Sequence, residues 1–400
     1  MTTSSTLQRP PVKEEPLPAK KLEPPAARLT WPQAVAWRLR RHHLDRRVAR
    51  SEMVAVAERL CGLHAQLMSS AELTLWARVE DLEPQALADG LWKERTLVKT
   101  WAMRGTLHVL PAADYPMWQS ALSTYRNYLK PSWLRAFGVS ADKLERFLGA
   151  VADALRDQLL TREELAAAVS RLTGSAELGE KVLGSWGSLL KPACYRGQLC
   201  FGPGVGQKVR FAHPETWLGP SDAVDPQAAV LDVARAFLGA HGPATRDDFA
   251  RWWAISPAQG QATIKGLGEE AVEVDVEGTP AWMLAESLPG ARERRRPHSV
   301  RLLPAFDQWV IAATRHVDQL LPGPLSSRIY RPQGWISPVL AVDGHTLGVW
   351  RHERKGAAVE VEIEPFVDLP AKVRRAAEHE AERLAAFLGG TLKLSWAATP

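Results

Sequence analysis

The stretch Thr245-Arg-Asp-Asp-Phe249 matches Thr161-Arg-Glu-Glu-Leu165, which lies 84 residues earlier in the chain. In both, an acidic residue follows the threonine by three positions, which is the spacing of a capping box at the start of a helix. Each stretch follows an amphipathic helical pattern and precedes a turn and another helical pattern. Two-stranded hairpins are predicted next, over 198–211 and 272–284. Three helices followed by a two-stranded wing is the element order of a winged helix.

A third unit of this kind is predicted in the N-terminal part of the chain. Thr30 is expected to cap a first helix, Ser51 begins a second, and Gly62 is expected to end the second in the left-handed conformation. Ser69 or Ser70 is expected to cap a third helix. The remaining elements are a fourth helix over about 83–101, a break at Arg104-Gly105 and a short strand over 106–110.

The pattern changes to short strands after residue 299. Asp343-Gly344 is a strong signal for a two-residue β-hairpin. The predicted elements are strands over 326–330, 336–342, 346–351 and 359–363, and a helix over about 371–388. This pattern favours a small β-barrel-like domain or a sheet, closed by a C-terminal helix.

The predicted fold class is therefore mainly α with β wings (α+β): three tandem winged-helix motifs plus the β-barrel-like domain. The expected parts are a disordered tail over 1–27, winged helix 1 with its interhelical linker over 28–125, winged helix 2 over 126–222, winged helix 3 over 223–297, and the β-rich C-terminal domain over 298–400.

Composition limits the class of protein. The 400 residues are 46% hydrophobic and 24% charged, which is enough apolar content for several cores. No apolar run is long enough for a membrane helix, and the N-terminus has no apolar segment of a secretion signal. The three cysteines form no C-x-x-C pair, so neither a disulfide framework nor a cysteine zinc site is indicated. We expect a cytoplasmic monomer without a metal or organic cofactor.

The positive charge is concentrated in two arginine-rich clusters. The net charge is only +5, but residues 28–60 hold eight arginines against three acids, and residues 292–301 hold five arginines against one glutamate. A solvated helix face explains either cluster alone. Because arginine suits phosphate contacts and two clusters occur in a nearly neutral chain, a nucleic-acid surface is favoured.

Common enzyme signatures are absent from the sequence. There is no Walker A loop, no H-E-x-x-H, no G-x-S-x-G and no acidic pair at metal spacing. Gly202, Gly204 and Gly206 lie between two predicted strands, so they indicate a hairpin turn rather than a phosphate loop.

The segment Gly62-Leu-His64-Ala-Gln66 is the candidate for chemistry. Residues two apart on an extended segment point to one face, so His64 and Gln66 are able to hold one water molecule together. A neutral imidazole accepts a proton near pH 7, and the amide orients the water by a hydrogen bond. The alternative is that both side chains satisfy exposed backbone groups between two helices.

Several segments resemble the winged-helix DNA glycosylases typified by AlkZ and YcaQ, in collinear order over roughly residues 30–390. The matching segments are Cys61-Gly-Leu-His64-Ala-Gln66, Ala71-Glu-Leu-Thr-Leu-Trp76-Ala-Arg78, Arg95-Thr-Leu-Val-Lys-Thr-Trp101-Ala-Met-Arg104-Gly-Thr-Leu-His108, His241-Gly-Pro-Ala-Thr245 with Trp252-Trp253, Leu302-Leu-Pro-Ala-Phe306-Asp307 and Asp343-Gly-His-Thr-Leu-Gly348-Val-Trp350. The resemblance implies three winged helices and a β-domain around a channel for duplex DNA. It also implies hydrolysis of the N-glycosidic bond of alkylated purines, including bulky N7-guanine adducts and, in some members, interstrand crosslinks. A monofunctional enzyme without lyase activity is expected, since no lysine appears beside His64 and Gln66 in the sequence to form a Schiff base.

The family's catalytic pair is Q-x-Q or Q-x-D, and His64-Ala-Gln66 stands at its place. The chain departs from the family at the first position and keeps the AlkZ-like glutamine at the second. The resemblance implies His64 and Gln66 as the catalytic residues. An N7-alkylated guanine already carries positive charge, so the enzyme mainly has to stabilise an oxocarbenium-like sugar and place a water, which His64 and Gln66 are suited to do.

The expected partner is double-stranded DNA containing alkylated bases, acted on in DNA repair or genotoxin resistance. The predicted DNA-binding residues are Arg38, Arg40, Arg41, Arg46, Arg47, Arg104, Arg294, Arg295 and Arg296. Asp307 matches a recurrent family position, for which a structural role is the alternative. The main competing function is a winged-helix regulator that binds DNA without catalysis, and a third is an interaction scaffold that uses the tryptophan-rich surfaces.

Overall fold

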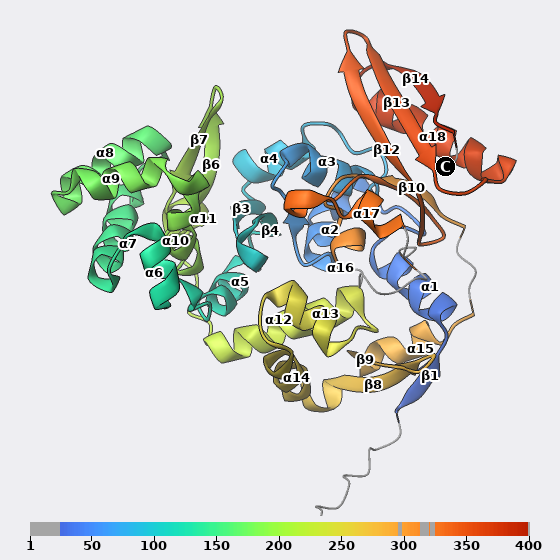
Figure 1. Cartoon of the computed structure of the whole chain (residues 1–400), viewed down its shortest axis with the longest axis horizontal. Coiled ribbons are helices and arrows are strands. Elements are labelled where there is room, and N and C mark those ends of the chain that lie inside the picture. Colours follow the sequence, from blue (N-terminus) through green and yellow to red (C-terminus); the bar gives the residue numbers. More distant parts are fainter. Residues whose placement is uncertain (1–24, 295–297, 313–319, 321–324, 399–400) are drawn as a thin grey trace, which may run out of the picture.

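The computed structural model describes residues 25–294, 298–312, 320 and 325–398. Almost all of the tail that we predicted over 1–27 lies outside these residues. Its predicted end is placed too late, because Ala27 is buried and begins strand β1 (Ala27–Leu29). Helices and strands both occur throughout, as expected for a mixed α and β chain (Figure 1).

The N-terminal block contains four helices and a hairpin. Its helices are α1 (Trp31–Arg41), α2 (Met53–Arg59), α3 (Met68–Trp76) and α4 (Ala86–Trp92). Thr30 caps α1 as predicted, through a capping box with Gln33. The prediction of one helix over 83–101 is wrong in its second half, because Leu97–Trp101 forms strand β3, which pairs antiparallel with β4 (Leu107–Pro111). The β-branched Val98 and Thr100 suit that strand.

The middle block continues the same sheet. Its helices are α5 (Tyr115–Leu122), α6 (Pro131–Phe137), α7 (Ala141–Leu155), α8 (Arg162–Thr173), α9 (Ala176–Leu183), α10 (Lys191–Tyr195) and α11 (Pro214–Leu218). Its strands are β5 (Leu160–Thr161), β6 (Cys200–Val205) and β7 (Lys208–Ala212), and β2 (Leu63–His64) completes a six-stranded sheet in the order β2-β4-β3-β6-β7-β5. Thr161 and Glu164 form the predicted capping box of α8.

The third block repeats the order of three helices and a hairpin. It contains α12 (Pro226–His241), α13 (Arg246–Trp253), α14 (Pro257–Gly266), β8 (Ala271–Val276), β9 (Thr279–Leu284) and α15 (Leu288–Ala291). Thr245 and Asp248 form the second predicted capping box. The N-terminal strand β1 pairs parallel with β8, so the start of the chain belongs to this block's three-stranded sheet.

The C-terminal part is an open sheet rather than the predicted β-barrel-like domain. Its strands are β10 (Val300–Leu303), β11 (Val339–Val342), β12 (His345–Lys355), β13 (Ala358–Pro365) and β14 (Thr391–Trp396), in sequence order across the sheet. Its helices are α16 (Gln308–Ala312), α17 (Ser326–Ile329) and α18 (Ala371–Phe387). Within the described part of the chain β10 and β14 are free edges. The strand predicted over 326–330 is wrong, since most of it is α17, whereas Asp343-Gly344 makes the predicted hairpin turn with both φ angles positive.

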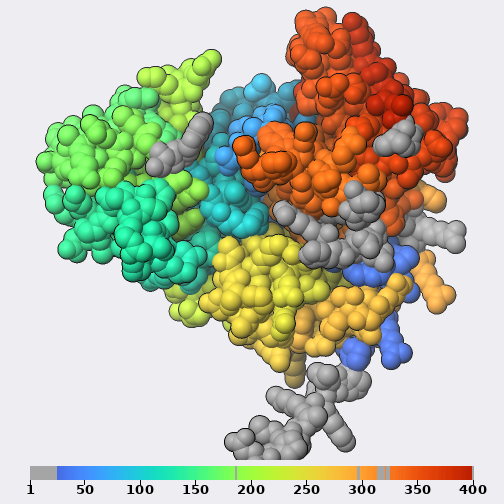
Figure 2. All heavy atoms as spheres, viewed as in Figure 1, coloured from blue at the N-terminus to red at the C-terminus, as the bar shows by residue number. Residues whose placement is uncertain are grey.

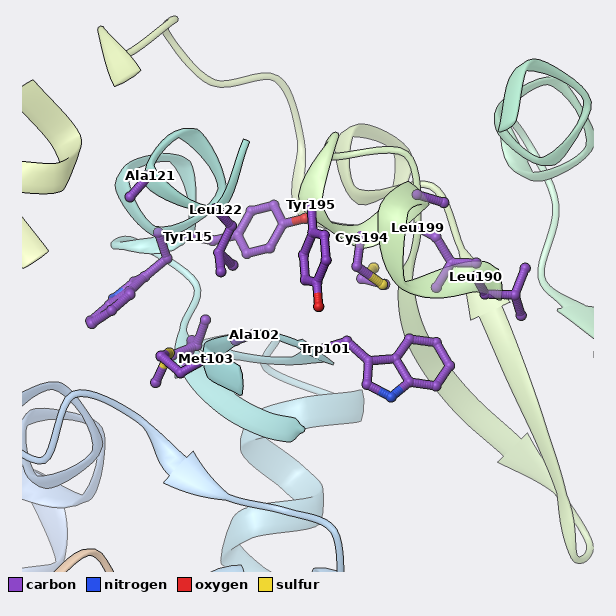
Figure 3. Close-up of a cluster of buried hydrophobic side chains, with 14 of the residues drawn as sticks. Trp101, Ala102, Met103, Tyr115, Ala121, Leu122, Leu190, Cys194, Tyr195 and Leu199 are labelled. Carbon is purple, nitrogen blue, oxygen red and sulfur yellow. The ribbon is translucent and has the colours of Figure 1, made fainter. Parts of the chain in front are cut away.

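The first and last parts of the chain share a core. One cluster of buried side chains joins residues of α1 to β4 with residues of β10 to α18. A second cluster joins the hairpin β3–β4 to the middle and third blocks; Figure 3 shows Trp101, Met103, Tyr115 and Tyr195 meeting there. The hairpins β6–β7 and β12–β13 project to the same side, and the space-filling view shows a hollow between them (Figures 1 and 2). The segment that follows α2 lies where these two clusters of buried side chains meet.

Candidate active site

The end of α2 sets the direction of the candidate catalytic segment. The amide of Gly62 donates to the carbonyl of Ala57 at 2.8 Å, and the amide of Cys61 donates to Glu58 at 2.9 Å, which is a Schellman pattern. The left-handed cap residue is Cys61, at φ 57°, and not Gly62 as we predicted. Gly62 also has positive φ, and a Cβ there would lie 2.5 Å from Leu110 Cδ2.

His64 lies on a short extended segment, as predicted. Strand β2 pairs antiparallel with β4, so that His64 is opposite His108. The amide of Ala65 donates to the carbonyl of Leu107 at 2.7 Å, and the chain then bends at Gln66. Helix α3 begins at Met68 without a side-chain cap, so the prediction that Ser69 or Ser70 caps it is wrong.

His64 and Gln66 line the same cavity, which has a volume of about 560 Å³. His64 is 5% exposed, whereas Gln66 is exposed to solvent. The backbone therefore delivers one buried imidazole and one accessible amide to a single cavity. This arrangement is able to hold a water molecule between an imidazole nitrogen and an amide.

His64 packs against two aromatic rings and is kept neutral by burial. Its ring stacks on Phe306 at a centroid distance of 4.8 Å and an angle of 16°, and it meets His108 edge-on at 5.4 Å. Burial, with a smaller contribution from the Arg104 guanidinium, lowers the pKa of His64 to about 4. Its Nδ1 atom is buried without a hydrogen-bond partner among the described residues. The imidazole is thus uncharged at neutral pH.

The loop before α16 fixes Phe306 against His64. Asp307 is fully buried and receives two hydrogen bonds of 2.8 Å from the guanidinium of Arg78. Gln308 Nε2 donates to the carbonyl of Gly62 at 2.7 Å, which ties this loop to the segment that carries His64. Phe306 has a φ of 58°, so the loop is held in the left-handed region by these contacts. Asp307 therefore positions the aromatic wall of the site and does not itself line the cavity.

Cationic side chains form another wall of the cavity. Arg104, Lys191 and Arg251 line it together with one carboxylate, that of Asp248. Arg104 Nη1 donates to the carbonyl of Trp252 at 2.8 Å, and Arg251 pairs with Asp248 at 2.6 Å. Burial lowers the pKa of both Arg104 and Lys191. A cavity with a neutral polar pair and a cationic wall suits a ligand that carries phosphates.

Lys191 and Trp335 are site residues that sequence reasoning missed. Both lie in segments without a signature, and only the tertiary fold brings them to His64. Phe306 did have a signal, because it is part of the segment Leu302-Leu-Pro-Ala-Phe306-Asp307 that resembles the glycosylase family.

Four of the predicted DNA-binding arginines in the first cluster have partners within the chain. Arg38 donates to the carbonyl of Pro243, and Arg41 donates to that of Gly239 at 2.6 Å. Arg40 pairs with Glu293 at 2.8 Å, and Arg47 pairs with the buried Glu380 at 2.6 Å. These predicted DNA contacts are thus already engaged in joining α1 and its following loop to distant parts of the chain.

The other predicted DNA-binding residues differ in their surroundings. Arg46 and Arg294 are exposed. Arg104 lies in the cavity described above. Arg295 and Arg296 lie outside the described residues.

The described residues offer neither a metal site nor a membrane-spanning helix. They contain no group of three or more histidine, cysteine, aspartate or glutamate side chains that is arranged to hold a metal ion. They also contain no helix that is both long and apolar enough to span a membrane.

Comparisons with known proteins place the chain in a known class of enzyme. The family model described as "DNA glycosylase AlkZ-like" matches residues 57–387. The interstrand DNA cross-link repair glycosylase of Streptomyces sahachiroi is 35% identical over 368 residues, which cover 90% of this chain and 97% of that protein. The solved structure of Streptomyces sahachiroi DNA glycosylase AlkZ is 34% identical and superposes with a TM-score of 0.83, covering 92% of this chain and 100% of that one.

The class is therefore that of the DNA glycosylases, enzymes that hydrolyse N-glycosidic bonds in DNA repair. Within this class the chain belongs to the AlkZ-like family.

Proposed function

We propose that this DNA glycosylase removes alkylated purines, N7-alkylguanines and bulky adducts among them, and that His64 and Gln66 carry the reaction. One observation carries the proposal: a buried, neutral imidazole and an accessible amide face one cavity that also has a cationic wall. The name of the relative from Streptomyces sahachiroi, an interstrand DNA cross-link repair glycosylase, supports the extension of the substrate range to crosslinks.

The proposed reaction begins with cleavage of the bond between the sugar C1′ and the purine N9. The bonding electrons leave with the base, whose positive charge at N7 is neutralised, and the sugar becomes an oxocarbenium ion. The water held by His64 and Gln66 then attacks C1′. As the new C–O bond forms, the water becomes acidic and passes a proton to the imidazole.

A weakly basic imidazole is sufficient for this role. A pKa of about 4 makes His64 a poor base toward free water, but it keeps the ring an uncharged acceptor at neutral pH. An uncharged ring also adds no positive charge beside a cationic sugar. The stack on Phe306 fixes the ring plane, so the position of the water is set before the base leaves.

The proposed DNA complex uses three winged helices, within 28–125, 126–222 and 223–297. The element order of helices followed by a hairpin in each part supports this assignment. Among the predicted DNA-binding residues, those best placed to contact phosphates are Arg46, Arg104 and Arg294. We propose Lys191 as a further phosphate contact. The other predicted arginines with partners in the chain serve mainly to stabilise the folded protein: Arg38, Arg40, Arg41 and Arg47.

We further propose that the enzyme is monofunctional and leaves an intact abasic strand. Because Lys191 lines the cavity, the check is borohydride treatment during incubation with abasic-site DNA. We expect no covalent complex; a trapped complex that disappears in Lys191→Arg would contradict this part of the proposal.

The principal test uses a duplex with a single N7-methylguanine. The wild-type protein is expected to release the base, which alkaline cleavage of the abasic site reveals. His64→Ala and Gln66→Ala should each lower the single-turnover rate by about 100-fold, within the usual range for general acid–base and positioning groups.

A matched control separates catalysis from folding. Gln198→Ala removes an amide that does not line the cavity and should leave the rate unchanged. Equal base release by wild type and by the His64→Ala/Gln66→Ala double variant would overturn the assignment. Tight sequence-selective binding to undamaged DNA, without base release, would instead favour the non-catalytic regulator.

A further inference from the structure

An aromatic cavity adjoins the cationic wall of the candidate active site. It has a volume of about 390 Å³, which is within the usual range for binding sites of small organic groups. Arg104, Gly105 and Lys191 line both cavities. A Cβ atom at Gly105 would lie 3.4 Å from Lys191 Nζ, so the lysine packs across this glycine. The aromatic cavity therefore shares one cationic edge with the active-site cavity.

Planar rings line the aromatic cavity. Trp133 and Phe137, both on α6, are half-buried and meet at a centroid distance of 4.2 Å. Tyr128 meets Trp133 edge-on at 6.4 Å, and Tyr125 meets Tyr195 edge-on at 5.4 Å. The hydroxyl of Tyr195 points from α10 toward the β3–β4 hairpin (Figure 3). Rings that are partly open to solvent suit the stacking of another planar, aromatic group.

Contacts within the chain hold these rings in place. The hydroxyl of Tyr125 donates to the carbonyl of Trp253. Arg196 Nε donates to the hydroxyl of Tyr128 at 3.1 Å, and the same guanidinium pairs with Glu145 at 2.6 Å. The walls of the aromatic cavity are thus ordered before a ligand enters, which lowers the entropic cost of binding.

The polar groups of the aromatic cavity suit a nucleotide. No carboxylate is among the described residues that line it, so a phosphate on Lys191 meets no negative side chain there. Asn127 is exposed at this cavity, and its amide offers both a donor and an acceptor to the polar edge of a nucleobase. Aromatic faces with an amide and a cation beside them are typical of sites for unstacked bases.

Successive nucleotides of one strand are joined by a single phosphate. Two cavities that share an arginine and a lysine therefore match two successive nucleotides, with the phosphate between them at the shared edge. We propose that the aromatic cavity binds the base directly next to the damaged nucleotide on the same strand, unstacked from the duplex and placed against Trp133 and Phe137. The proposal rests on the proposed active site at His64 and Gln66 and adds a nucleotide subsite to it.

This subsite recognises a normal base and not the lesion. Unstacking a base from the duplex costs free energy, and stacking on aromatic side chains offsets that cost for any of the bases. Because the damaged base stays in the active-site cavity, occupation of the aromatic cavity does not depend on the size of the lesion. We expect the subsite to contribute equally to duplexes with small and with large lesions.

The test combines loss of a ring with loss of a base. The duplexes carry N7-methylguanine on a 2′-fluoro sugar, which resists cleavage, so dissociation constants are measurable by fluorescence anisotropy. One duplex is intact, and the others have a tetrahydrofuran residue, which lacks a base, at the 5′ neighbour, at the 3′ neighbour or opposite the lesion. Trp133→Ala should raise the dissociation constant of the intact duplex about five-fold or more, as expected for one stacked base. It should have less than about two-fold effect on the duplex without a base at one of the two neighbours.

Further variants separate the subsite from a general effect on folding. Phe137→Ala should show the same dependence on the neighbouring base, and Trp133→Phe should recover part of the affinity. Leu129→Ala removes an exposed apolar side chain that lines neither cavity, so it should leave every dissociation constant unchanged. Melting temperatures show whether each variant is folded.

The outcomes separate this proposal from the proposed function, which release of N7-methylguanine from a duplex with the natural sugar tests. If wild type releases the base, but Trp133→Ala and Phe137→Ala weaken all the duplexes equally or weaken none, the subsite is wrong and the proposed function stands. If their effect disappears only when the base opposite the lesion is missing, the occupant comes from the other strand, which also overturns the proposal. If wild type releases no base, the proposed function fails, and the dissociation constants still decide whether the subsite exists.

Discussion

His64 combines a position in the wall of a cavity with an environment that suppresses its charge. The ring stacks on Phe306 and meets His108 edge-on, and burial lowers its pKa to about 4. The resemblance to the glycosylase family implies a glutamine at the corresponding position of its members, and a glutamine never ionises. The lowered pKa makes the histidine of this chain resemble that amide at neutral pH.

The first prediction concerns the pH dependence of base release. Because His64 in the free enzyme loses its neutral form only as the pH falls through about 4, kcat/KM should be nearly constant between pH 6 and 8. An unshifted histidine would lose half of its neutral form by about pH 6.5. The measurement is kcat/KM for an N7-methylguanine duplex at pH 5.5, 6.5 and 7.5; an inflection near 6.5 that is absent in His64→Gln would contradict the assignment.

The second prediction concerns replacement of the same residue. His64→Gln restores an uncharged acceptor that holds a water, so it should retain base release within about ten-fold of wild type, whereas His64→Ala should lose about 100-fold. Single-turnover rates on the same duplex measure both. Equal loss in the two variants would mean that the imidazole, and not a neutral acceptor, is required.

At the scale of elements, the site depends on buried polar contacts between segments far apart in the sequence. Asp307 joins the loop before α16 to Arg78 after α3, and both side chains are fully buried. His42 Nε2 lies 3.2 Å from His241 Nδ1, which joins the end of α1 to the end of α12. These contacts hold together the segments that surround the cavity.

The third prediction is that Asp307→Ala lowers the free energy of unfolding by about 3–5 kcal/mol, because it leaves the Arg78 guanidinium buried without its carboxylate. Glu362→Ala breaks the exposed pair with Arg351 and should cost less than about 1 kcal/mol. Denaturant unfolding measures both. A similar small loss in the two variants would show that Asp307 is not the structural anchor described here.

The fourth prediction concerns stability in acid. Burial lowers the pKa of His241 to about 3, so below pH 6.5 the unfolded chain binds a proton that the folded chain does not. Stability should therefore be greatest above pH 6.5 and fall as the pH decreases, by about 2 kcal/mol for this histidine at pH 5. Melting temperatures at pH 7.5 and 5 should differ less in His241→Gln than in wild type; an equal difference would contradict the prediction.

Local sequence signals predicted those elements whose structure is decided locally. The capping boxes at Thr161 and Thr245 and the turn at Asp343-Gly344 are present because neighbouring residues make the contacts. The helix predicted through 97–101 failed because sheet pairing with β4 and β6 decides that segment. Lys191 and Trp335 had no local signal, since their proximity to His64 is a tertiary property.

At the scale of the whole molecule, several arginines of the first cluster take part in contacts within the chain. Arg47 is 8% exposed in its side chain and paired with a buried carboxylate, whereas the exposed Arg46 has no side-chain hydrogen bond or ion pair within the described residues. Much of the first arginine cluster, over residues 28–60, is engaged in contacts with distant parts of the chain. Lys191, outside both clusters, lies at the cavity itself.

The fifth prediction distinguishes a cationic side chain that lines the cavity from one that is engaged in packing within the chain. Lys191→Ala should weaken binding to duplex DNA and reduce the slope of log K against log salt by about 0.9 for the phosphate contact that is lost. Arg47→Ala should leave that slope unchanged and lower the melting temperature, because Glu380 loses its closest partner. Fluorescence anisotropy titrations at several salt concentrations measure the slopes, and Lys93→Ala, an exposed lysine outside the cavity, is the control.

The pairing of β1 with β8 has a consequence for how the chain is made. Ala27 and Leu29 leave the ribosome early, but their partners in the sheet are Val274 and Val276. The three-stranded sheet is therefore unable to close until more than two thirds of the chain has been synthesised. Until then β1 and the apolar face of α1 lack their packing partners in the third block. The final packing of the N-terminal block therefore depends on a part of the chain that is synthesised late. If a ribosome stalls before residue 276, strand β1 of the nascent chain lacks the complete strand β8 with which it pairs.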